Sequence, residues 1–411
     1  MTVARTGWPS PDDFGSAPNP RDIARWEDAD RAARPARLAR LRARFADAGI
    51  DAYYGVRREH MRYLTGFTLA EGEEKTAGSS GQFLVAGDEV VLFADSRYTI
   101  QARCQAPEAR VEAVYGDLPS RWPELVGSIG ARRVGVEAGF VPHAVWGRLG
   151  AAAPDVELVP IEGWLEGDRA TKEPSEIERI AAACAVADRA LAMLLPEIVP
   201  GVTEAALALR LEWLIRTGGA EALAFDVACL SGPEAALPHG HPGDRPVRAG
   251  AVLLFDFGAQ VAGYRSDMTR TLFVGEPVPR DLDVYELVAR AQAEAIEALR
   301  AAVERAAAGA TELPSGRTVD SVARDVIAAA GHFDHFGHSL GHGIGLATHE
   351  APSLSTRAPE SPLPSPTVFS VEPGVYLEGQ TGVRIEDLVT IDAAAGRLDR
   401  LTHFPREVVV V

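Results

Sequence analysis

The sequence predicts two folded domains, an α/β domain in the N-terminal third of the chain and a larger α+β domain after it. In the first region, short apolar runs rich in β-branched residues alternate with helical runs, which is typical of an α/β domain. In the second region, long helical segments and antiparallel-looking strands form separate blocks, which favours an α+β domain. The chain has 411 residues, of which 46% are hydrophobic, so both domains can bury a core of ordinary size.

The N-terminal region begins with a predicted flexible arm over residues 1–27, whose first twenty residues are rich in proline, glycine and aspartate. The α/β domain is predicted over residues 28–165. It opens with an amphipathic helix at 28–48, which we expect Gly49 to end. Its other predicted elements are strands at 51–56, 82–86, 90–94, 134–137 and 158–161, and helices at 98–104 and 120–129.

The second domain is predicted over residues 170–411, because Gly, Asp and Lys accumulate just before it and a long helix follows. Ser175 is the expected N-cap of that helix, with Glu176 and Glu178 in the first turn, where the helix dipole favours anions. The other predicted helices cover 204–216, 282–308 and 319–330. The predicted strands cover 251–257, 268–274, 368–371, 375–377, 383–391 and 407–411.

The net charge is strongly acidic, since 41 Lys and Arg residues stand against 58 Asp and Glu residues and give −17 at pH 7. Nucleic acids and anionic membranes need a basic surface, so we expect neither as a partner. No apolar stretch approaches the roughly 18 residues of a membrane helix. The first residues lack the apolar core of a signal peptide, and three scattered cysteines imply no disulfide framework. The expected location is the cytoplasm.

Two carboxylates interrupt the apolar strands of the second domain. Asp256 follows the run Ala-Val-Leu-Leu-Phe, and an unpaired buried carboxylate costs several kcal/mol. A turn near residues 261–262 is expected to place Asp267 directly opposite Asp256. Two facing carboxylates repel each other unless a cation lies between them. The alternative for this pair alone is a surface hairpin in which Asp267 pairs with Arg265 or Arg270.

Three of the ten histidines fall within twelve residues, at His338, His342 and His349. Glycines at alternate positions between them argue against a helix and indicate extended backbone that something approaches closely. Each histidine alone has an ordinary structural explanation, but three in a glycine-rich segment favour a metal or catalytic site. The spacing fits neither the His-Glu-x-x-His zinc helix nor a dinucleotide-binding loop.

Two further acids and an arginine lie in the C-terminal strands. Glu372 ends an apolar strand before a turn, and period-two alternation places Arg384 and Glu386 on one face of a later strand. A strand-end acid and a surface ion pair are the plain alternatives for these residues. Taken together, the buried acids and one imidazole form a set whose charge two divalent cations would neutralise: Asp256, Asp267, His342, Glu372 and Glu386. Such oxygen-rich ligands suit Mn²⁺, Co²⁺ or Zn²⁺.

These five residues, in this order and each in its local context, resemble the ligand set of the pita-bread metallopeptidases. That family includes methionine aminopeptidases, Xaa-Pro aminopeptidases, prolidases and creatinases. The resemblance spans residues 30–411 and is most specific over 225–391, and the segment Leu-Pro-His239-Gly resembles the Xaa-Pro branch. It implies a creatinase-like α/β N-terminal domain followed by a pita-bread α+β catalytic domain.

The resemblance also implies how the metal ions are held. Asp256 would chelate the first metal, Asp267 and Glu386 would bridge both, and His342 and Glu372 would hold the second. Two divalent cations, with Mn²⁺ as the first expectation, lower the pKa of a shared water from about 15.7 towards 7 and so activate it for hydrolysis.

The activity implied by the resemblance is hydrolysis of the Xaa-Pro bond in a proline-containing peptide. Glu372 is expected to act as general base besides ligating metal. His239 and His349 resemble histidines that shuttle protons and contact the substrate, and His338 is expected to line the pocket for the proline ring. Arg384 is expected to orient a metal-binding carboxylate. The family usually forms dimers, so a homodimer is expected.

Two other functions compete with this prediction. A creatinase-like C–N hydrolase shares the fold but does not need all five ligands, and a non-catalytic peptide-binding module typically loses ligands. The sequence leaves open whether the enzyme acts on Xaa-Pro dipeptides or on longer peptides, because that preference depends on how the cleft is closed beyond proline.

Overall fold

The computed structural model describes residues 8–69, 80–116 and 118–411, which form two compact units. The N-terminal unit comprises Ala24–Asp168, and the C-terminal unit comprises Met1–Ile23 together with Arg169–Val411. Within the described residues, no helix has the length and apolar character that crossing a membrane requires.

A six-stranded mixed sheet forms the centre of the N-terminal unit, in the order β4-β3-β2-β1-β5-β6. The β1–β2 and β2–β3 pairs are antiparallel, whereas β1–β5, β3–β4 and β5–β6 are parallel. The strands are β1 (Ala52–Gly55), β2 (Gln82–Ala86), β3 (Glu89–Ala94), β4 (Arg110–Ala113), β5 (Arg133–Glu137) and β6 (Glu157–Ile161). The helices are α1 (Pro20–Ala43), α2 (Phe45–Ala48), α3 (Arg58–Thr65), α4 (Thr99–Gln105), α5 (Leu118–Ser128), α6 (His143–Ala152) and α7 (Trp164–Ala170).

The predicted α/β character and all five predicted strands of this unit are confirmed. The predicted helix at 28–48 begins earlier, at Pro20, and breaks at Arg44, while Gly49 ends it in the left-handed region with φ 62°. The sequence analysis missed β4, α3, α6 and α7. β4 is a four-residue strand that contains Arg110 and Glu112, so it lacks the apolar run by which strands are recognised.

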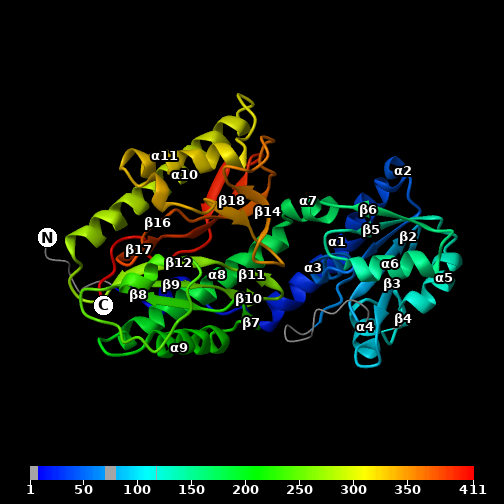
Figure 1. The fold of residues 1–411 in the computed structure, drawn as a ribbon, viewed down its shortest axis with the longest axis horizontal. Helices are drawn as coiled ribbons and strands as arrows, with labels where there is room; N and C mark the ends of the chain where they lie inside the picture. The colour runs from blue at the N-terminus through cyan, green and yellow to red at the C-terminus, as the bar shows by residue number, and fades with distance from the viewer. Residues whose placement is uncertain (1–7, 70–79, 117) are drawn as a thin grey trace. The chain divides into compact units, whose positions relative to one another are not determined.

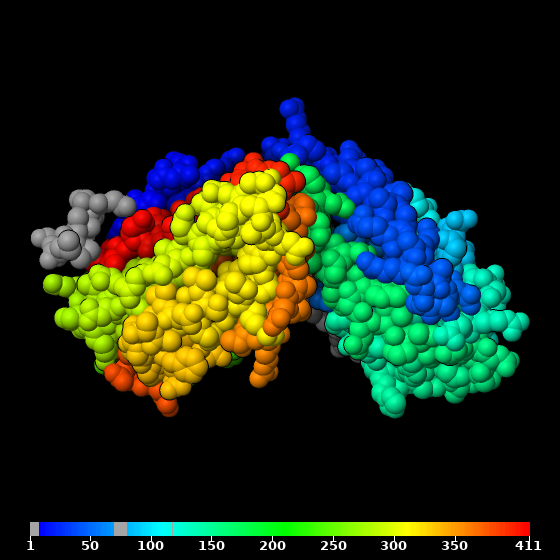
Figure 2. Space-filling view, turned by 90° about the horizontal axis from the view of Figure 1, so that it is seen from above, coloured from blue at the N-terminus to red at the C-terminus, as the bar shows by residue number. Residues whose placement is uncertain are grey.

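The C-terminal unit contains two helix pairs with strands between them (Figure 1). The helices are α8 (Pro174–Leu194), α9 (Glu204–Thr217), α10 (Pro279–Ala307) and α11 (Gly316–Ala329). Four short 3-10 helices accompany them, η1 (Pro11–Phe14), η2 (Leu195–Glu197), η3 (Gly232–Ala236) and η4 (Phe333–His335). In Figure 2 the α10–α11 pair appears as the yellow surface of this unit. The buried faces of α10 and α11 share one apolar core with the strands.

Four antiparallel sheets complete the C-terminal unit, with the orders β12-β9-β8, β11-β10-β7, β14-β13-β15-β18-β19 and β16-β17. The strands before α10 are β7 (Ala222–Leu223), β8 (Ala228–Ser231), β9 (Val252–Phe257), β10 (Ala259–Val261), β11 (Tyr264–Arg265) and β12 (Met268–Phe273). Those after α11 are β13 (Gly341–Gly343), β14 (Glu350–Leu354), β15 (Thr367–Val371), β16 (Gly374–Leu377), β17 (Thr381–Arg384), β18 (Asp387–Asp392) and β19 (Arg397–Arg400). The predicted α+β class is confirmed.

Three local predictions for this unit are wrong. Helix α8 begins at Pro174, so its N-cap is Glu173, which forms a reciprocal capping box with Glu176, and Ser175 lies inside the first turn. The predicted strand at 383–391 is divided into β17 and β18. The predicted strand at 407–411 makes one isolated bridge, between Val410 and Phe273, and otherwise forms no sheet.

Residues 8–15 of the predicted N-terminal arm pack against the rest of the C-terminal unit. The Phe14 ring stacks on the Phe404 ring at 6.1 Å, Trp8 Nε1 donates to the Val410 carbonyl at 3.0 Å, and Arg189 donates to the Gly15 carbonyl. Residues 1–7 of the arm lie outside the described residues, and its flexibility stays a prediction.

Candidate metal centre

The hairpin that carries Asp256 and Asp267 has a register different from the predicted one. Asp256 lies opposite Thr269, not opposite Asp267. The turn falls at Ala262–Gly263, whose φ angles of 47° and 84° are both positive, as a tight hairpin turn with the strand twist requires. This turn is one position later than predicted, which shifts the pairing by two residues. Asp267 is therefore the diagonal neighbour of Asp256 and remains on the same side of the hairpin.

The alternative of a surface hairpin is wrong for these residues. Asp267 is only 5% exposed, and Arg270, its suggested partner, instead forms an ion pair with Asp387 at 2.7 Å. A carboxylate in this position needs another source of positive charge.

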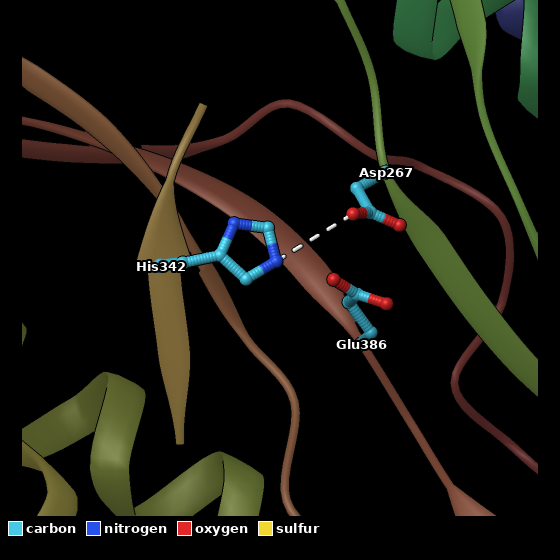
Figure 3. Close-up of side chains that lie close together, drawn as sticks. All are labelled: Asp267, His342 and Glu386. Carbon is cyan, nitrogen blue, oxygen red and sulfur yellow. Dashed lines mark ion pairs between the residues drawn. The ribbon is translucent and has the colours of Figure 1, made fainter. Parts of the chain in front are cut away.

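Three of the predicted ligands converge from separate segments of the C-terminal unit. Asp267 precedes β12, His342 lies in β13, and Glu386 lies between β17 and β18, and their side chains point toward one another (Figure 3). One ligand atom from each lies within 4.8 Å of the others, and His342 Nε2 is 3.6 Å from Asp267 Oδ2. Glu372 Oε1 lies 3.3 Å from the same imidazole nitrogen.

The donor set fits divalent cations. Asp256 Oδ1 and Glu386 Oε1 are buried and accept no hydrogen bond from the described residues, so each offers a lone pair inside the cluster. Burial raises the pKa of Asp267 well above its usual range, and Glu386, Asp256 and Glu372 raise it further. The pKa of Glu386 is raised well above its usual range for the same two reasons, burial and then neighbouring carboxylates. Such crowding of acids is relieved by bound cations.

One buried arginine accompanies the acids. Arg384, 4% exposed, donates from Nη2 to Asp256 Oδ2 at 2.6 Å, from Nε to Thr269 Oγ1 at 2.8 Å and from Nη1 to the Tyr376 hydroxyl at 2.8 Å. The plain alternative, a surface ion pair between Arg384 and Glu386, is wrong because both are buried and Arg384 pairs with Asp256. Arg384 thus fixes one oxygen of Asp256 and leaves the other free for a metal ion.

Three hydroxyl groups complete the cluster, and the sequence analysis missed all of them. Thr269 Oγ1 donates to Glu386 Oε2 at 2.8 Å. Ser370 Oγ accepts from the His342 backbone N–H at 3.0 Å and donates to Glu372 Oε1 at 3.0 Å. The third is that of Tyr376. The sequence could have indicated Tyr376, because a tyrosine in a strand that packs on the core needs a partner for its hydroxyl. Threonine and serine are common in strands, so nothing in the sequence distinguished Thr269 or Ser370.

The glycine-rich segment owes its composition to neighbouring strands. A Cβ atom on Gly341 would lie 1.9 Å from the Ser370 carbonyl oxygen, and one on Gly343 would lie 2.1 Å from the Ala351 carbonyl oxygen. The predicted close approach is confirmed, and the approaching group is the backbone of β15 and of β14. The glycines therefore let β13 lie deep between two strands and carry His342 to the acids.

We expect Gly341→Ala to lower the free energy of unfolding by about 1–3 kcal/mol or more, because backbone atoms must move to accept the methyl group. Gly337→Ala is the matched control, since a Cβ there meets nothing within 4 Å. Urea denaturation of both variants checks this prediction. Equal stability of the two would contradict the crowding argument.

The other three predicted histidines surround the acids. The His349 ring lies 4.2 Å from the His342 ring, and burial, followed by the effect of His342, lowers its pKa to about 4. Burial and then Arg384 lower the pKa of His338 to about 4. His239 lies in an exposed loop after η3, close enough to act electrostatically on His338, His349 and Glu372. At neutral pH the rings of His338 and His349 are therefore uncharged.

The segment that carries His349 is held by a buried ion cluster. Glu350 accepts from the Ala347 backbone N–H at 2.7 Å, pairs with Arg169, and lies 3.3 Å from Lys172 Nζ. Burial alone would raise the pKa of Glu350, but Arg169 and Lys172 outweigh it and hold the pKa below its usual value. The sequence analysis missed this cluster, whose members are far apart along the chain.

Comparison with known proteins decides the family. Residues 178–393 match the family described as Metallopeptidase family M24, and residues 37–171 match the Creatinase/Prolidase N-terminal domain. The chain belongs to metallopeptidase family M24. As an M24 member it is a metallopeptidase hydrolase of prolidase-like type, and the predicted resemblance and two-part fold are confirmed.

Similar proteins cover almost the whole M24 chain. The Xaa-Pro dipeptidase of Pyrococcus horikoshii is 35% identical over 361 residues, 88% of this chain and 95% of that protein. The solved structure of an Xaa-Pro dipeptidase from Bacillus anthracis has a TM-score of 0.81 at 33% identity and covers 91% of this chain and 99% of that one. An X-Pro aminopeptidase from Thermotoga maritima MSB8 has a TM-score of 0.76 at 35% identity, with coverages of 88% and 98%.

Proposed function

We propose that this M24 peptidase is a two-metal enzyme that hydrolyses Xaa-Pro bonds, at the N-terminus of peptides or in dipeptides. The observation that carries the proposal is the convergence of Asp267, His342 and Glu386 in a buried cluster whose carboxylates outnumber its one guanidinium, that of Arg384. Relatives at 33–35% identity that are named Xaa-Pro dipeptidase and X-Pro aminopeptidase support the proline specificity.

The proposed metal ligands divide between two positions. Asp256 would hold the first, His342 and Glu372 would hold the second, and Asp267 and Glu386 would serve both. Two divalent cations would supply Lewis acidity for the scissile carbonyl and would lower the pKa of a bound water. We propose Mn²⁺ as the native metal, with Co²⁺ and Zn²⁺ as substitutes, because the set is oxygen-rich and contains no thiolate.

Glu372 is the proposed general base. Burial, and after it Asp256, raises the pKa of Glu372 to about 7 against the opposing effect of Arg384. A carboxylate at this position would accept a proton from the attacking water and pass it to the leaving proline nitrogen. Its hydrogen bond from Ser370 fixes one oxygen and so orients the group.

The three outer histidines are assigned to the substrate. His338 Nδ1 lies 2.8 Å from the Ser339 carbonyl and Nε2 lies 2.9 Å from the Tyr376 hydroxyl, so both nitrogens are occupied, and we assign the ring to the wall of the pocket for proline. The hydrogen-bond network assigns the proton to Nδ1. His239 and His349 are more exposed and remain available to contact the peptide carbonyl and to transfer protons.

We expect His349→Ala to lower kcat at least about tenfold while the protein keeps its metal, because one proton-transferring group is lost and no ligand is removed. The measurement is kcat on an Xaa-Pro peptide, with metal content determined on the same sample. His332→Ala, at the residue directly before η4, is the matched control. An unchanged kcat for His349→Ala would show that its role is assigned wrongly.

The substrate class is tested with three compounds. Gly-Pro, a longer Xaa-Pro-Yaa peptide and creatine are assayed with metal-free protein, with and without Mn²⁺. Metal-dependent release of the residue before proline is expected, and the ratio of the two peptide rates distinguishes dipeptidase from aminopeptidase. The match of residues 37–171 to a Creatinase/Prolidase domain is the reason to include creatine. Cleavage of creatine alone would replace the proposal by the creatinase-like alternative, and no cleavage by metal-loaded protein would support a binding module.

The proposal includes a cytoplasmic homodimer, on the grounds of the family resemblance. It includes neither nucleic acid nor an anionic membrane as a partner, because the net charge is −17. Light scattering on the purified protein tests the oligomeric state.

A further inference from the structure

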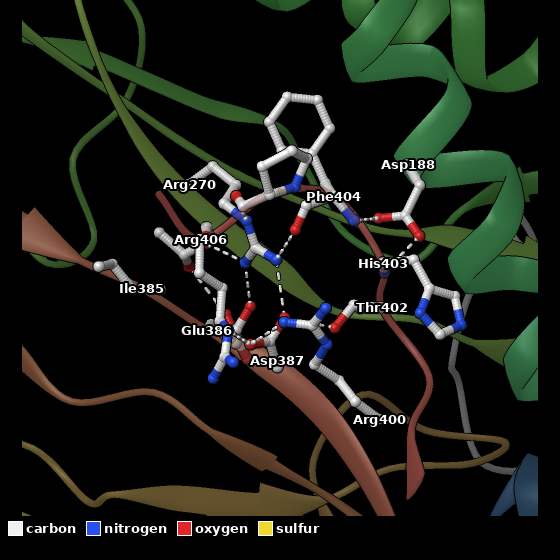
Figure 4. A network of polar contacts seen from close by, with 12 residues as sticks. Asp188, Arg270, Ile385, Glu386, Asp387, Arg400, Thr402, His403, Phe404 and Arg406 are labelled. Atoms are coloured by element: carbon white, nitrogen blue, oxygen red, sulfur yellow. Dashed lines mark hydrogen bonds and ion pairs between the residues drawn. The ribbon is translucent and has the colours of Figure 1, made fainter. Parts of the chain in front are cut away.

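A second buried cluster lies directly behind Glu386, and its centre is Arg270 (Figure 4). Arg270 is 1% exposed and uses every guanidinium donor. Nε donates to the Pro405 carbonyl at 2.9 Å, and Nη1 donates to the Thr269 and Glu386 carbonyls at 3.0 and 2.5 Å. Nη2 donates to Asp387 Oδ1 and to the Phe404 carbonyl, both at 2.7 Å.

The acceptors of Arg270 belong to three segments that are distant in sequence. The first is β12, which follows Asp267, and the second is the start of β18, which follows Glu386. The third comprises residues 402–406, which we call the C-terminal strap. Adjacent residues in extended chain point to opposite faces, so Arg270 and Asp387 point away from the metal-facing side chains of Thr269 and Glu386. The network touches the backbones that carry the ligands and not the ligand atoms.

The C-terminal strap is itself held on both sides. Asp387 is fully buried and accepts from the Thr402 hydroxyl at 2.6 Å and from Gln292 Nε2 at 3.2 Å. Asp188, on α8, accepts from the backbone N–H groups of His403 and Phe404 at 2.7 and 3.1 Å. The groups that Arg270 binds are therefore themselves held in place by residues of α8 and α10.

We propose that Arg270, Asp387 and the C-terminal strap form a positioning network that fixes the separation of the two backbones carrying Asp267 and Glu386, and thereby sets the affinity of the metal centre. The proposal rests on the ligand assignment made under the proposed function. Its physical basis is that Asp267 and Glu386 come from two separate segments, and their carboxylate oxygens must keep a fixed separation to bind the same metal ions. Glu386 lies between β17 and β18, outside the regular sheet hydrogen bonding that would otherwise fix its backbone. The Glu386 backbone N–H donates to the Thr269 carbonyl at 3.1 Å, and Arg270 reinforces this link because its Nη1 donates to the carbonyls of both Thr269 and Glu386.

A purely structural ion pair is the competing explanation. Removing one partner of a buried pair destabilises a protein wherever the pair lies, so loss of stability alone would not distinguish the two. Metal affinity and ligand geometry do distinguish them, because a structural pair elsewhere in the unit leaves both unchanged.

The test uses Asp387→Asn and Arg270→Lys, with Asp281→Asn as control. Asp281 is a buried carboxylate paired with Arg280 at the start of α10, and among the described residues its side chain forms no hydrogen bond with Asp267, Glu386 or the C-terminal strap. Metal-free proteins are titrated with Mn²⁺, the absorption spectrum of the Co²⁺ form is recorded, and melting of the metal-free forms is measured. Thr402→Val, which removes one hydrogen bond from the strap and keeps its shape, serves if the stronger variants do not fold.

We expect the Mn²⁺ dissociation constant of Asp387→Asn and Arg270→Lys to rise about 10–100-fold, with an altered Co²⁺ spectrum, as for groups that orient metal ligands from behind. Thr402→Val should show the same changes in smaller measure, and Asp281→Asn should leave both readouts at wild-type values. Unchanged metal affinity and spectrum in folded variants, or an equal loss in Asp281→Asn, would overturn the proposal. Because no peptide is involved, a wild-type protein that binds metal but cleaves no Xaa-Pro bond overturns the proposed function alone.

Discussion

Replacement of Asp267 by alanine is expected to abolish metal binding and peptidase activity together. Asp267 is the residue that the geometry places against both His342 and Glu386, so its loss removes a ligand from each proposed metal position. Metal ions supply several kcal/mol of transition-state stabilisation. Since each 1.36 kcal/mol corresponds to a factor of ten in rate, kcat/KM should fall by at least about 10³-fold.

The measurements for Asp267→Ala are metal content by elemental analysis and kcat/KM on an Xaa-Pro peptide. The matched control is Asp283→Ala, which removes an exposed carboxylate from α10 of the same unit and should change neither. Full activity of Asp267→Ala without stoichiometric metal would refute the two-metal proposal. A circular-dichroism spectrum like that of the wild type shows that the loss is not one of folding.

Removal of the metal ions is expected to make the stability of the protein fall as the pH rises from about 6.5 to 8. The folded, metal-free protein holds the pKa of Glu372 at about 7, and the pKa values of Asp267 and Glu386 well above their usual range, whereas unfolding returns all three to ordinary values. Below about pH 6.5 the histidines oppose this effect, because burial holds the pKa values of His338 and His349 at about 4 and the unfolded state binds the protons that these rings lack. Above that pH the carboxyl groups alone hold extra protons in the folded state, so stability decreases with pH.

Urea denaturation of chelator-treated protein at several pH values measures this dependence. Added Mn²⁺ should restore stability most at the high end, since cations bind the deprotonated carboxylates. Asp267→Asn is the matched variant: it removes one titrating group and should flatten the pH profile of the metal-free protein. A metal-free wild type whose stability stays constant or increases from about pH 6.5 to 8 would show that the acids are not crowded in the absence of metal.

The sequence predicted the metal-facing acids because each is an exception to a strong local pattern. Asp256 and Glu372 stand at the ends of apolar strands, and a carboxylate there needs a physical reason that a surface acid does not. His342 could be recognised through its glycines, since alternate glycines leave few structures other than closely approached extended chain. Strand β9 was predicted for the same reason, since it is apolar on both sides of Asp256, and β15, which precedes Glu372, is apolar apart from Thr367 and Ser370.

The parts that could not be predicted depend on tertiary contacts or on turn geometry. The hairpin register depends on the positive φ of Ala262. Alanine rarely adopts that conformation, so the sequence did not indicate it. The interruption between β17 and β18 is invisible in an alternating pattern that continues through Ile385 and Glu386. The hydroxyl of Thr269 and the guanidinium of Arg270 acquire their roles from partners more than a hundred residues away.

The ion cluster around Glu350 determines where the catalytic half of this peptidase can be separated from the rest of the chain. Its two cations, Arg169 and Lys172, precede the first helix residue of α8, Pro174, which looks like the natural starting point for an excised fragment. A fragment that starts there leaves the buried Glu350 carboxylate without a counter-ion, directly beside His349. An unpaired buried charge lowers the free energy of unfolding by several kcal/mol. Shortened versions intended for crystallisation or engineering should therefore retain the five residues ahead of that proline.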